Sequence, residues 1–179
     1  SLQVVKLERT QATESDLWLV FTPIKKARLD VLIEKAGELG AERLVPVRTE
    51  WTSVRDMNID RAQVLVIEAA EQCGRMTVPA VDPIAPLHEV LARWPDDRRL
   101  LFCDESGTGA PIANALADEV PGAWAVLIGP EGGFSPGERA AIAAKPFALP
   151  VSLGPRVLRA DTAAITALAI LQAHLGDWH

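Results

Sequence analysis

Two short loops in the last third of the chain carry the residue types that could bind a small ligand. Residues 129–135 read GPEGGFS, residues 152–159 read SLGPRVLR, and each loop follows an apolar run, at 124–128 and 148–151. Glycine lets the backbone approach a ligand closely, and in open α/β sheets ligands bind at the carboxyl ends of strands. The pair therefore predicts one ligand held between two turns, largely by main-chain groups.

A structural interpretation of both loops stays open beside this one. The first has the composition of an ordinary strand-to-helix connection, because Ser135, Pro136 and Glu138 form a capping-box sequence at a helix start. In the second, Leu153 and Leu158 suit the apolar wall of a ligand site, and they equally suit a hydrophobic core.

The elements that must position these loops alternate between strands and helices, which predicts an α/β fold with a mostly parallel sheet. Strands are expected at residues 18–21, 43–47, 100–103, 124–128 and 148–151. Helices are expected at residues 29–39 with Gly40 as the stop, from the cap Asp60 to Cys73 with Gly74 as the stop, at residues 112–119, after Ser135, and after the cap Asp161. No GxGxxG sequence follows the first strand, where a dinucleotide-binding fold would need it.

Composition predicts one globular domain in a reducing compartment. The 179 residues are 49% apolar and 23% charged, which fits a folded domain rather than a disordered chain. The most apolar stretch, residues 160–175, contains Asp161 and indicates a buried or interface helix rather than a membrane span. Cys73 and Cys103 lack the spacing of a zinc motif. We expect free thiols, no metal and a cytoplasmic protein.

The charge is unevenly distributed. The net charge is −6, yet the first 75 residues hold eleven Lys or Arg against twelve Asp or Glu. This part of the chain could form a local basic face or an ordinary surface of mixed charge.

The two loops, together with EKAGELG at residues 34–40 and EAAEQCGR at 68–75, resemble the ribosomal RNA small subunit methyltransferase E family of the SPOUT superfamily. The resemblance covers roughly residues 17–175. It implies a mostly parallel sheet flanked by helices with a C-terminal deep trefoil knot, a feature that periodicity cannot reveal. It also implies that residues 1–16 are a remnant of an N-terminal PUA-like barrel or a linker, and that residues 17–179 form the methyltransferase domain.

The resemblance implies S-adenosylmethionine as the cofactor, bound by the two loops and by the end of the strand at 100–103. The cofactor-binding residues that we expect are Leu101, Phe102, Cys103, Gly129, Pro130, Glu131, Gly132, Gly133, Leu149, Leu153, Gly154, Val157 and Leu158. The block at 100–103 matches the family only loosely, and it brings Asp104 and Glu105 near the expected ribose.

The implied reaction is methylation of N3 of a uridine in 16S rRNA, on naked RNA or on the assembled small subunit. That nitrogen must lose a proton, which a carboxylate could accept, while an Arg could stabilise charge on the uracil oxygens. Glu131 and Asp161 are the candidate bases; Arg75, Arg156 and Arg159 are the candidate cations. Asp161 equally suits a helix cap.

Two positions depart from the family pattern. Residues 160–162 read ADT where the family often has TET, which keeps a carboxylate with a shorter reach, and Cys73 stands where Ser is common. In the last helix, Ala164, Leu168 and Leu171 share one face with Leu175. A core helix explains this face, and the resemblance implies a homodimer interface beside the knot.

Two other functions remain open on the sequence alone. SPOUT enzymes that act on other RNAs, such as tRNA, share the cofactor loops, and only the block at 71–75 favours rRNA. A nucleotide-binding or RNA-binding module without catalysis would carry the same loops and would bind cofactor without transferring a methyl group.

Overall fold

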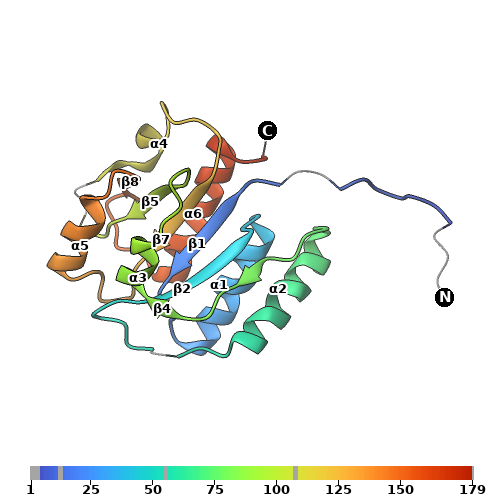
Figure 1. Cartoon of the computed structure of the whole chain (residues 1–179), viewed down its shortest axis with the longest axis horizontal. Coiled ribbons are helices and arrows are strands. Elements are labelled where there is room, and N and C mark those ends of the chain that lie inside the picture. The colour runs from blue at the N-terminus through green and yellow to red at the C-terminus, as the bar shows by residue number, and fades with distance from the viewer. Residues whose placement is uncertain (1–4, 12–13, 55, 107–108, 179) are drawn as a thin grey trace.

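A computed structural model of the chain describes residues 5–11, 14–54, 56–106 and 109–178. Within these residues, strands and helices alternate from Leu17 to Leu175 (Figure 1). The strands are β1 (Leu17–Phe21), β2 (Arg43–Arg48), β3 (Ala80–Val81), β4 (Ala85–Pro86), β5 (Arg99–Cys103), β6 (Ala110–Pro111), β7 (Trp124–Ile128) and β8 (Ala148–Ser152). The helices are α1 (Lys26–Glu38), α2 (Ile59–Cys73), α3 (Leu87–Ala92), α4 (Ile112–Ala115), α5 (Pro136–Ala143) and α6 (Ala160–Leu175).

The strands form one sheet in the order β3-β2-β1-β7-β5-β8-β6, with β4 paired to β2. Each recorded strand pair is parallel. The central strand β7 is buried along its whole length, because a parallel sheet is covered on both faces and its middle strands become continuous apolar runs. This order brings the carboxyl ends of β7, β5 and β8 side by side, which is where both glycine-containing loops begin.

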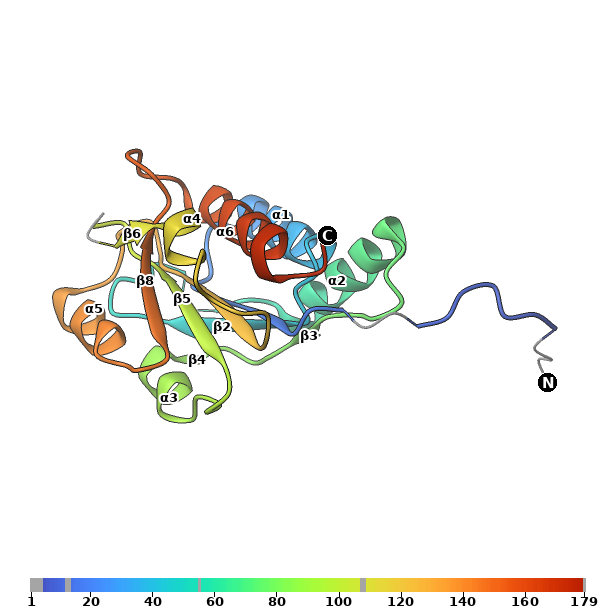
Figure 2. The same cartoon turned by 90° about the horizontal axis from the view of Figure 1, so that it is seen from above.

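Helices cover the two faces of the sheet unequally. Figure 2 shows α1, α2 and α6 on one face, and α3 and α5 on the other. The larger core cluster joins α1, α2 and α6 to the sheet, and the smaller one places Leu87, Leu91 and Ile142 against the opposite face. Ala164, Leu168 and Leu171 of α6 are buried together with Leu175, so the expected inward face of this helix is confirmed.

A buried glutamine fastens the end of α6 to the beginning of the described fold. The side chain of Gln172 is fully buried, and its Nε2 donates to the carbonyl of Leu39 at 2.8 Å. Its Oε1 accepts from Ser15 Oγ at 3.0 Å and from the backbone N–H of Asp177 at 3.1 Å. The segments before β1 and after α6 therefore meet at the edge of the sheet where the strands begin.

The expected α/β fold class is confirmed, as are the five expected strands to within one residue. The predicted helix stops are also confirmed, since Gly40 and Gly74 follow α1 and α2 with positive φ angles of 84° and 75°. The trefoil knot stays a prediction. Leu2 and Val4 of the expected N-terminal strand fragment lie outside the described residues, and Val5 is exposed and lies in no strand.

Three expectations about helix ends are wrong. Asn58, not Asp60, caps α2, because its side chain accepts from the N–H of Arg61 at 2.9 Å. Asp161 does not cap α6; the cap residue is Arg159, without a side-chain hydrogen bond, and α6 begins at Ala160. The helix expected at 112–119 ends at Ala115. Turns follow it, in which a backbone N–H donates to the carbonyl three residues earlier, from Ala117 to Asn114 and from Glu119 to Leu116.

Candidate active site

A cavity of about 620 Å³ opens between the two predicted loops at the carboxyl edge of the sheet. Its size lies in the range of sites that enclose a cofactor or another small molecule. Main-chain-rich turns, apolar side chains and a few charged groups share the lining. The lining residues are Cys103, Asp104, Glu105, Ser106, Gly109, Pro111, Ile128, Gly129, Pro130, Glu131, Ser152, Leu153, Gly154, Pro155, Arg156, Val157, Leu158, Ala160 and Ala163.

The first loop is a tight turn wrapped over the buried ring of Phe134. The N–H of Gly133 donates to the carbonyl of Pro130 at 2.9 Å, which closes the turn. Gly133 has φ +72°, a conformation that strains other residues. A Cβ at Gly129 would lie 2.6 Å from the Phe134 ring, so only glycine permits this close approach.

The expected capping box directly after this loop is confirmed. Ser135 Oγ accepts from the N–H of Glu138 at 3.2 Å, and Glu138 Oε2 accepts from the N–H of Ser135 at 3.0 Å. The other oxygen of Glu138 accepts from the N–H of Glu50 at 2.8 Å. One carboxylate therefore fixes the start of α5 and also the segment that follows β2.

An ion-pair network forms the wall of the cavity after β5. Arg139 Nε donates to Asp104 Oδ1 at 2.9 Å, and Arg139 Nη2 donates to Glu105 Oε1 at 2.5 Å. Asp104 is 5% exposed and also accepts from the hydroxyl and the N–H of Ser106. Burial raises the pKa of the Asp104 carboxyl, but the hydrogen bonds from Ser106 and Arg139 outweigh burial and hold the pKa below its usual value.

Glu105 also contacts the first loop. Its Oε1 accepts from the N–H of Phe134 at 3.4 Å, and a Cβ on Gly133 would lie only 2.0 Å from that oxygen. The first loop, the end of β5 and α5 are thus joined through one carboxylate. Any side chain at Gly133 would displace this carboxylate from the cavity wall.

The second loop contributes the opposite wall. Leu153 packs partly against the main core and also lines the cavity, so its position is compatible with both sequence interpretations. Val157 is 81% exposed and Ser152 Oγ accepts from the N–H of Gly154 at 3.2 Å. An apolar side chain that projects from a loop into solvent beside a cavity is available for contact with a ligand.

Eight of the expected cofactor-binding residues line the cavity: Cys103, Gly129, Pro130, Glu131, Leu153, Gly154, Val157 and Leu158. Five do not: Leu101, Phe102, Gly132, Gly133 and Leu149. Leu101 and Phe102 are fully buried inside β5, and only the end of that strand reaches the cavity. Burial raises the pKa of the Cys103 thiol to about 12, so this side chain meets the cavity as a neutral thiol.

The candidate catalytic residues separate into two groups. Glu131 is exposed and lines the cavity, as does Arg156, while the exposed Arg159 lies just before α6 and outside the lining. Asp161 is paired with Arg28, whose Nη1 lies 2.8 Å from Asp161 Oδ1 and 2.9 Å from Oδ2. The Asp161 carboxylate therefore connects α6 to α1 and does not line the cavity.

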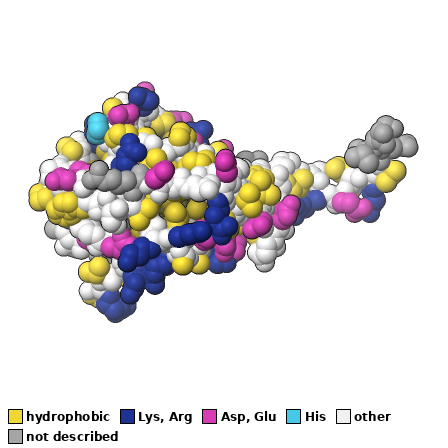
Figure 3. Space-filling model, turned by 90° about the horizontal axis from the view of Figure 1, so that it is seen from below, with side chains coloured by type: hydrophobic (Ala, Val, Ile, Leu, Met, Phe, Trp, Pro, Cys, Tyr) yellow, Lys and Arg dark blue, Asp and Glu magenta, His cyan; other side chains and the backbone are white. Residues whose placement is uncertain are grey.

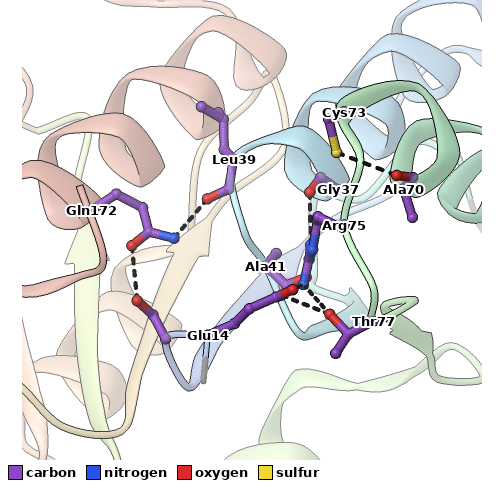
Figure 4. Close-up of polar contacts among 10 residues, drawn as sticks. Glu14, Gly37, Leu39, Ala41, Ala70, Cys73, Arg75, Thr77 and Gln172 are labelled. Carbon is purple, nitrogen blue, oxygen red and sulfur yellow. Dashed lines mark hydrogen bonds and ion pairs between the residues drawn. The ribbon is translucent and has the colours of Figure 1, made fainter. Parts of the chain in front are cut away.

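Arg75 lies away from the cavity, near the point where α1 ends (Figure 4). Its guanidinium donates to the carbonyls of Gly37 and Ala41 at 2.7 and 2.9 Å and to Glu14 Oε2 at 2.5 Å. The side chain is only 9% exposed. Arg75 therefore fastens the segment before β1 to the ends of α1 and α2.

The part of the lining contributed by β6 and by the start of α6 was not predicted from the sequence. Gly109, Pro111, Ala160 and Ala163 belong to it, and β6 is too short to show a strand pattern. The Pro111-Ile112 start of α4 was the available signal for a turn there.

Among the described residues, no three His, Cys, Asp or Glu side chains converge as they would around a metal ion. No helix in the described part of the chain is long and apolar enough to cross a membrane.

Comparison with known proteins agrees with this geometry. Residues 11–172 match the family described as RNA methyltransferase domain. The crystal structure of a ribosomal RNA small subunit methyltransferase E from Neisseria gonorrhoeae bound to S-adenosyl methionine aligns with a TM-score of 0.78 and 32% identity, over 92% of this chain and 68% of that one. The chain belongs to the ribosomal RNA small subunit methyltransferase E family. The family resemblance is confirmed.

Two further relatives agree. A putative methyltransferase from Legionella pneumophila in complex with the bound cofactor SAM aligns with a TM-score of 0.79 and 31% identity, over 96% of this chain and 71% of that one. The ribosomal RNA small subunit methyltransferase E of Rickettsia conorii is 33% identical over 88% of this chain and 64% of its own length. The chain spans between 51% and 64% of the length of the first three curated relatives that it matches.

Proposed function

We propose that this chain is an S-adenosylmethionine-dependent methyltransferase domain that methylates N3 of a uridine in 16S rRNA of the small ribosomal subunit. The cavity between the two glycine-containing loops is the observation that carries the proposal. Relatives named for small-subunit rRNA methylation and solved with this cofactor support it. The same substrate would make the cytoplasm its working compartment.

The lining of the cavity fits this cofactor chemically. Adenine offers hydrogen-bond donors and acceptors on its edge, which the main chain of residues 152–155 can match, and Leu153 and Leu158 can cover its faces. Glu105 carries a carboxylate that suits ribose hydroxyls. When bound, S-adenosylmethionine supplies a methyl group on a positively charged sulfur.

Glu131 and Arg156 are the side chains proposed to act on the uracil. N3 must give up its proton before its electron pair can take the methyl carbon, and the Glu131 carboxylate is positioned at the cavity to accept that proton. Arg156, on the opposite loop, would stabilise the negative charge that develops on the uracil oxygens. Holding both reactants in one cavity supplies much of the remaining acceleration.

Basic residues at the carboxyl edge are proposed to bind the RNA backbone. Lys25 and Lys26 follow β1, Arg48 ends β2, and Arg156 and Arg159 follow β8. All five are exposed, and no ion pair joins any of them to another described residue. Viewed from below, the molecule shows Lys and Arg side chains gathered on this side (Figure 3). Phosphates are the expected partners of such cations.

A homodimer is part of the proposal. The outward face of α6 carries Thr162, Ile165, Ala169 and Ala173, which are exposed or partly exposed. Small and apolar side chains permit close packing against a second copy.

Calorimetric titration of S-adenosylmethionine into the purified chain tests the cofactor site, with Gly133→Val as the variant. We expect saturable binding by the parent chain and its loss in Gly133→Val, because a side chain would collide with Glu105 and strain the turn. Gly122→Val is the matched control, since open space surrounds a Cβ there. No binding by a well-folded parent chain would reject the proposal.

Methyl transfer is then measured on small subunits and on naked 16S rRNA that lack the modification, with mass spectrometry to locate the methyl group. A methyl group on uridine N3 supports the proposal. Transfer only to tRNA would point to another SPOUT substrate, and binding without transfer to any RNA would point to a non-catalytic module.

A further inference from the structure

Trp51 is a large aromatic side chain left exposed beside the first loop. It is 45% exposed and lies in the connection between β2 and α2. A Cβ added to Gly132 would lie 3.7 Å from Trp51 Cβ and 3.9 Å from its ring atom Cε3, so the Trp51 side chain lies close to Gly132. The adjacent residue, Glu131, lines the cavity.

The backbone on both sides of Trp51 is fixed. The N–H of Thr49 donates to Thr52 Oγ1 at 2.7 Å, and the N–H of Thr52 donates to the carbonyl of Thr49 at 3.3 Å. Thr52 is 6% exposed, and the N–H of Glu50 is held by the carboxylate of Glu138. The indole is therefore presented to solvent from a rigid turn, so ordering it against a ligand costs little conformational entropy.

Trp51 shares the carboxyl edge of the sheet with three exposed cations. Arg48 lies three residues earlier at the end of β2, and Lys25 and Lys26 follow the neighbouring strand β1. These three cations are exposed and form no ion pair with another described residue. An aromatic face next to uncommitted cations is the arrangement by which proteins hold single-stranded nucleic acid.

The proposed reaction needs such a contact. N3 of a paired uracil is engaged in a base pair, so the target must be unpaired and held out of its stack before it can be methylated. Unpaired bases are held by stacking on aromatic rings, which accepts any base and adds affinity without sequence readout.

We propose that Trp51 is an RNA-binding residue on which an unpaired base of the segment carrying the target nucleotide stacks. This inference rests on the proposed function, and it adds a substrate-positioning residue outside the cofactor cavity.

The test compares Trp51→Ala and Trp51→Phe with the parent chain, on small subunits that lack the modification. We expect kcat/KM for methyl transfer to fall about tenfold or more in Trp51→Ala and to be largely restored in Trp51→Phe, because a ring still allows stacking. The Kd for S-adenosylmethionine should stay within about twofold of the parent value, since Trp51 does not line the cavity.

Trp178→Ala is the matched control. Trp178 is 51% exposed and lies near Arg75, away from the cofactor cavity, so its removal should leave methyl transfer unchanged. If the parent chain is active and Trp51→Ala has the same kcat/KM, the inference is overturned and the proposed function is not. If the drop in kcat/KM of Trp51→Ala is accompanied by a changed sedimentation coefficient, a second copy of the chain covers Trp51. That result also overturns the inference.

A binding measurement separates this inference from the proposed function. Fluorescence anisotropy follows a labelled single-stranded uridine-rich oligonucleotide bound to the parent chain, Trp51→Ala and Trp178→Ala. Weaker binding in Trp51→Ala alone supports the inference even if the parent chain transfers no methyl group. No binding by the parent chain, or equal binding by all three proteins, overturns it.

Discussion

Asp104 is the most deeply buried carboxylate beside the cavity, and its charge is maintained by specific hydrogen bonds. Its pKa is lowered in the folded chain, so its ionised form stabilises the fold above about pH 3.8, the usual value, and this contribution disappears as the pH falls through the lowered pKa. We expect Asp104→Asn to be less stable than the parent chain at pH 7. Urea unfolding at pH 7 and near pH 3 measures both proteins.

The difference in unfolding free energy between the two proteins should shrink as the pH decreases, because a protonated Asp104 resembles Asn in charge. Asp118→Asn is a suitable control, since Asp118 is exposed and forms no ion pair with another described residue. An unchanged difference between parent and Asp104→Asn at both pH values would contradict the role assigned to the ion pair with Arg139.

At the same scale, sequence reasoning found the residues of the site unevenly. The loop residues were predictable because glycine and proline mark tight turns in any context. Leu101 and Phe102 were expected to bind the cofactor beside Cys103 but do not line the cavity, because a fully apolar strand gives no sign of where it leaves the core. The partners of Arg75 and Asp161 were not predictable, since they come from segments distant in the chain, near Glu14 and Arg28.

The start of α5 shows how one element sets the geometry of two loops. Ser135→Ala removes the acceptor for the N–H of Glu138, and we expect it to lower the free energy of unfolding by about 1 kcal/mol. Ser53→Ala serves as the control, since Ser53 is exposed and caps no helix. Chemical denaturation measures all three proteins; an equal decrease in both variants would contradict a specific capping effect.

Elements differ in how well the sequence predicts them. The capping box was predicted because its geometry is local: three neighbouring residues satisfy each other. The strands β1, β2, β5, β7 and β8 were predicted because each is an apolar run. The two-residue strands β3, β4 and β6 have no periodicity to detect, and they exist only because a neighbouring strand offers free backbone groups. Asn58 and Asp60 are both good caps, and only tertiary packing decides between them.

The whole molecule is acidic, with a net charge of −6, yet its carboxyl edge carries uncommitted cations. We expect Lys25→Ala combined with Lys26→Ala to weaken RNA binding and to reduce the salt dependence. The slope of log K against log salt should fall by about 0.7 for each phosphate that the variant no longer neutralises. Anisotropy titrations between low and moderate salt give that slope.

Arg93→Ala is the control for this charge effect. The Arg93 side chain is 82% exposed and lies after α3, on the approach to β5, at the opposite edge of the sheet. Its removal changes the net charge by the same amount as one lysine but should leave the salt slope unchanged. A reduction of the slope in Arg93→Ala half as large as that in the double lysine variant would show that RNA responds to total charge and does not distinguish one edge.

The contacts of Gln172 with Ser15 and Asp177 have a practical consequence for experiments on this chain. They bring the segments that lead to both ends together at the amino edge of the sheet, while the cavity opens at the other edge. An affinity handle or a sensor surface joined to the segment after α6 would thus lie at the edge of the sheet opposite the cavity. The two loops that border the cavity, and Trp51, would then face the solution.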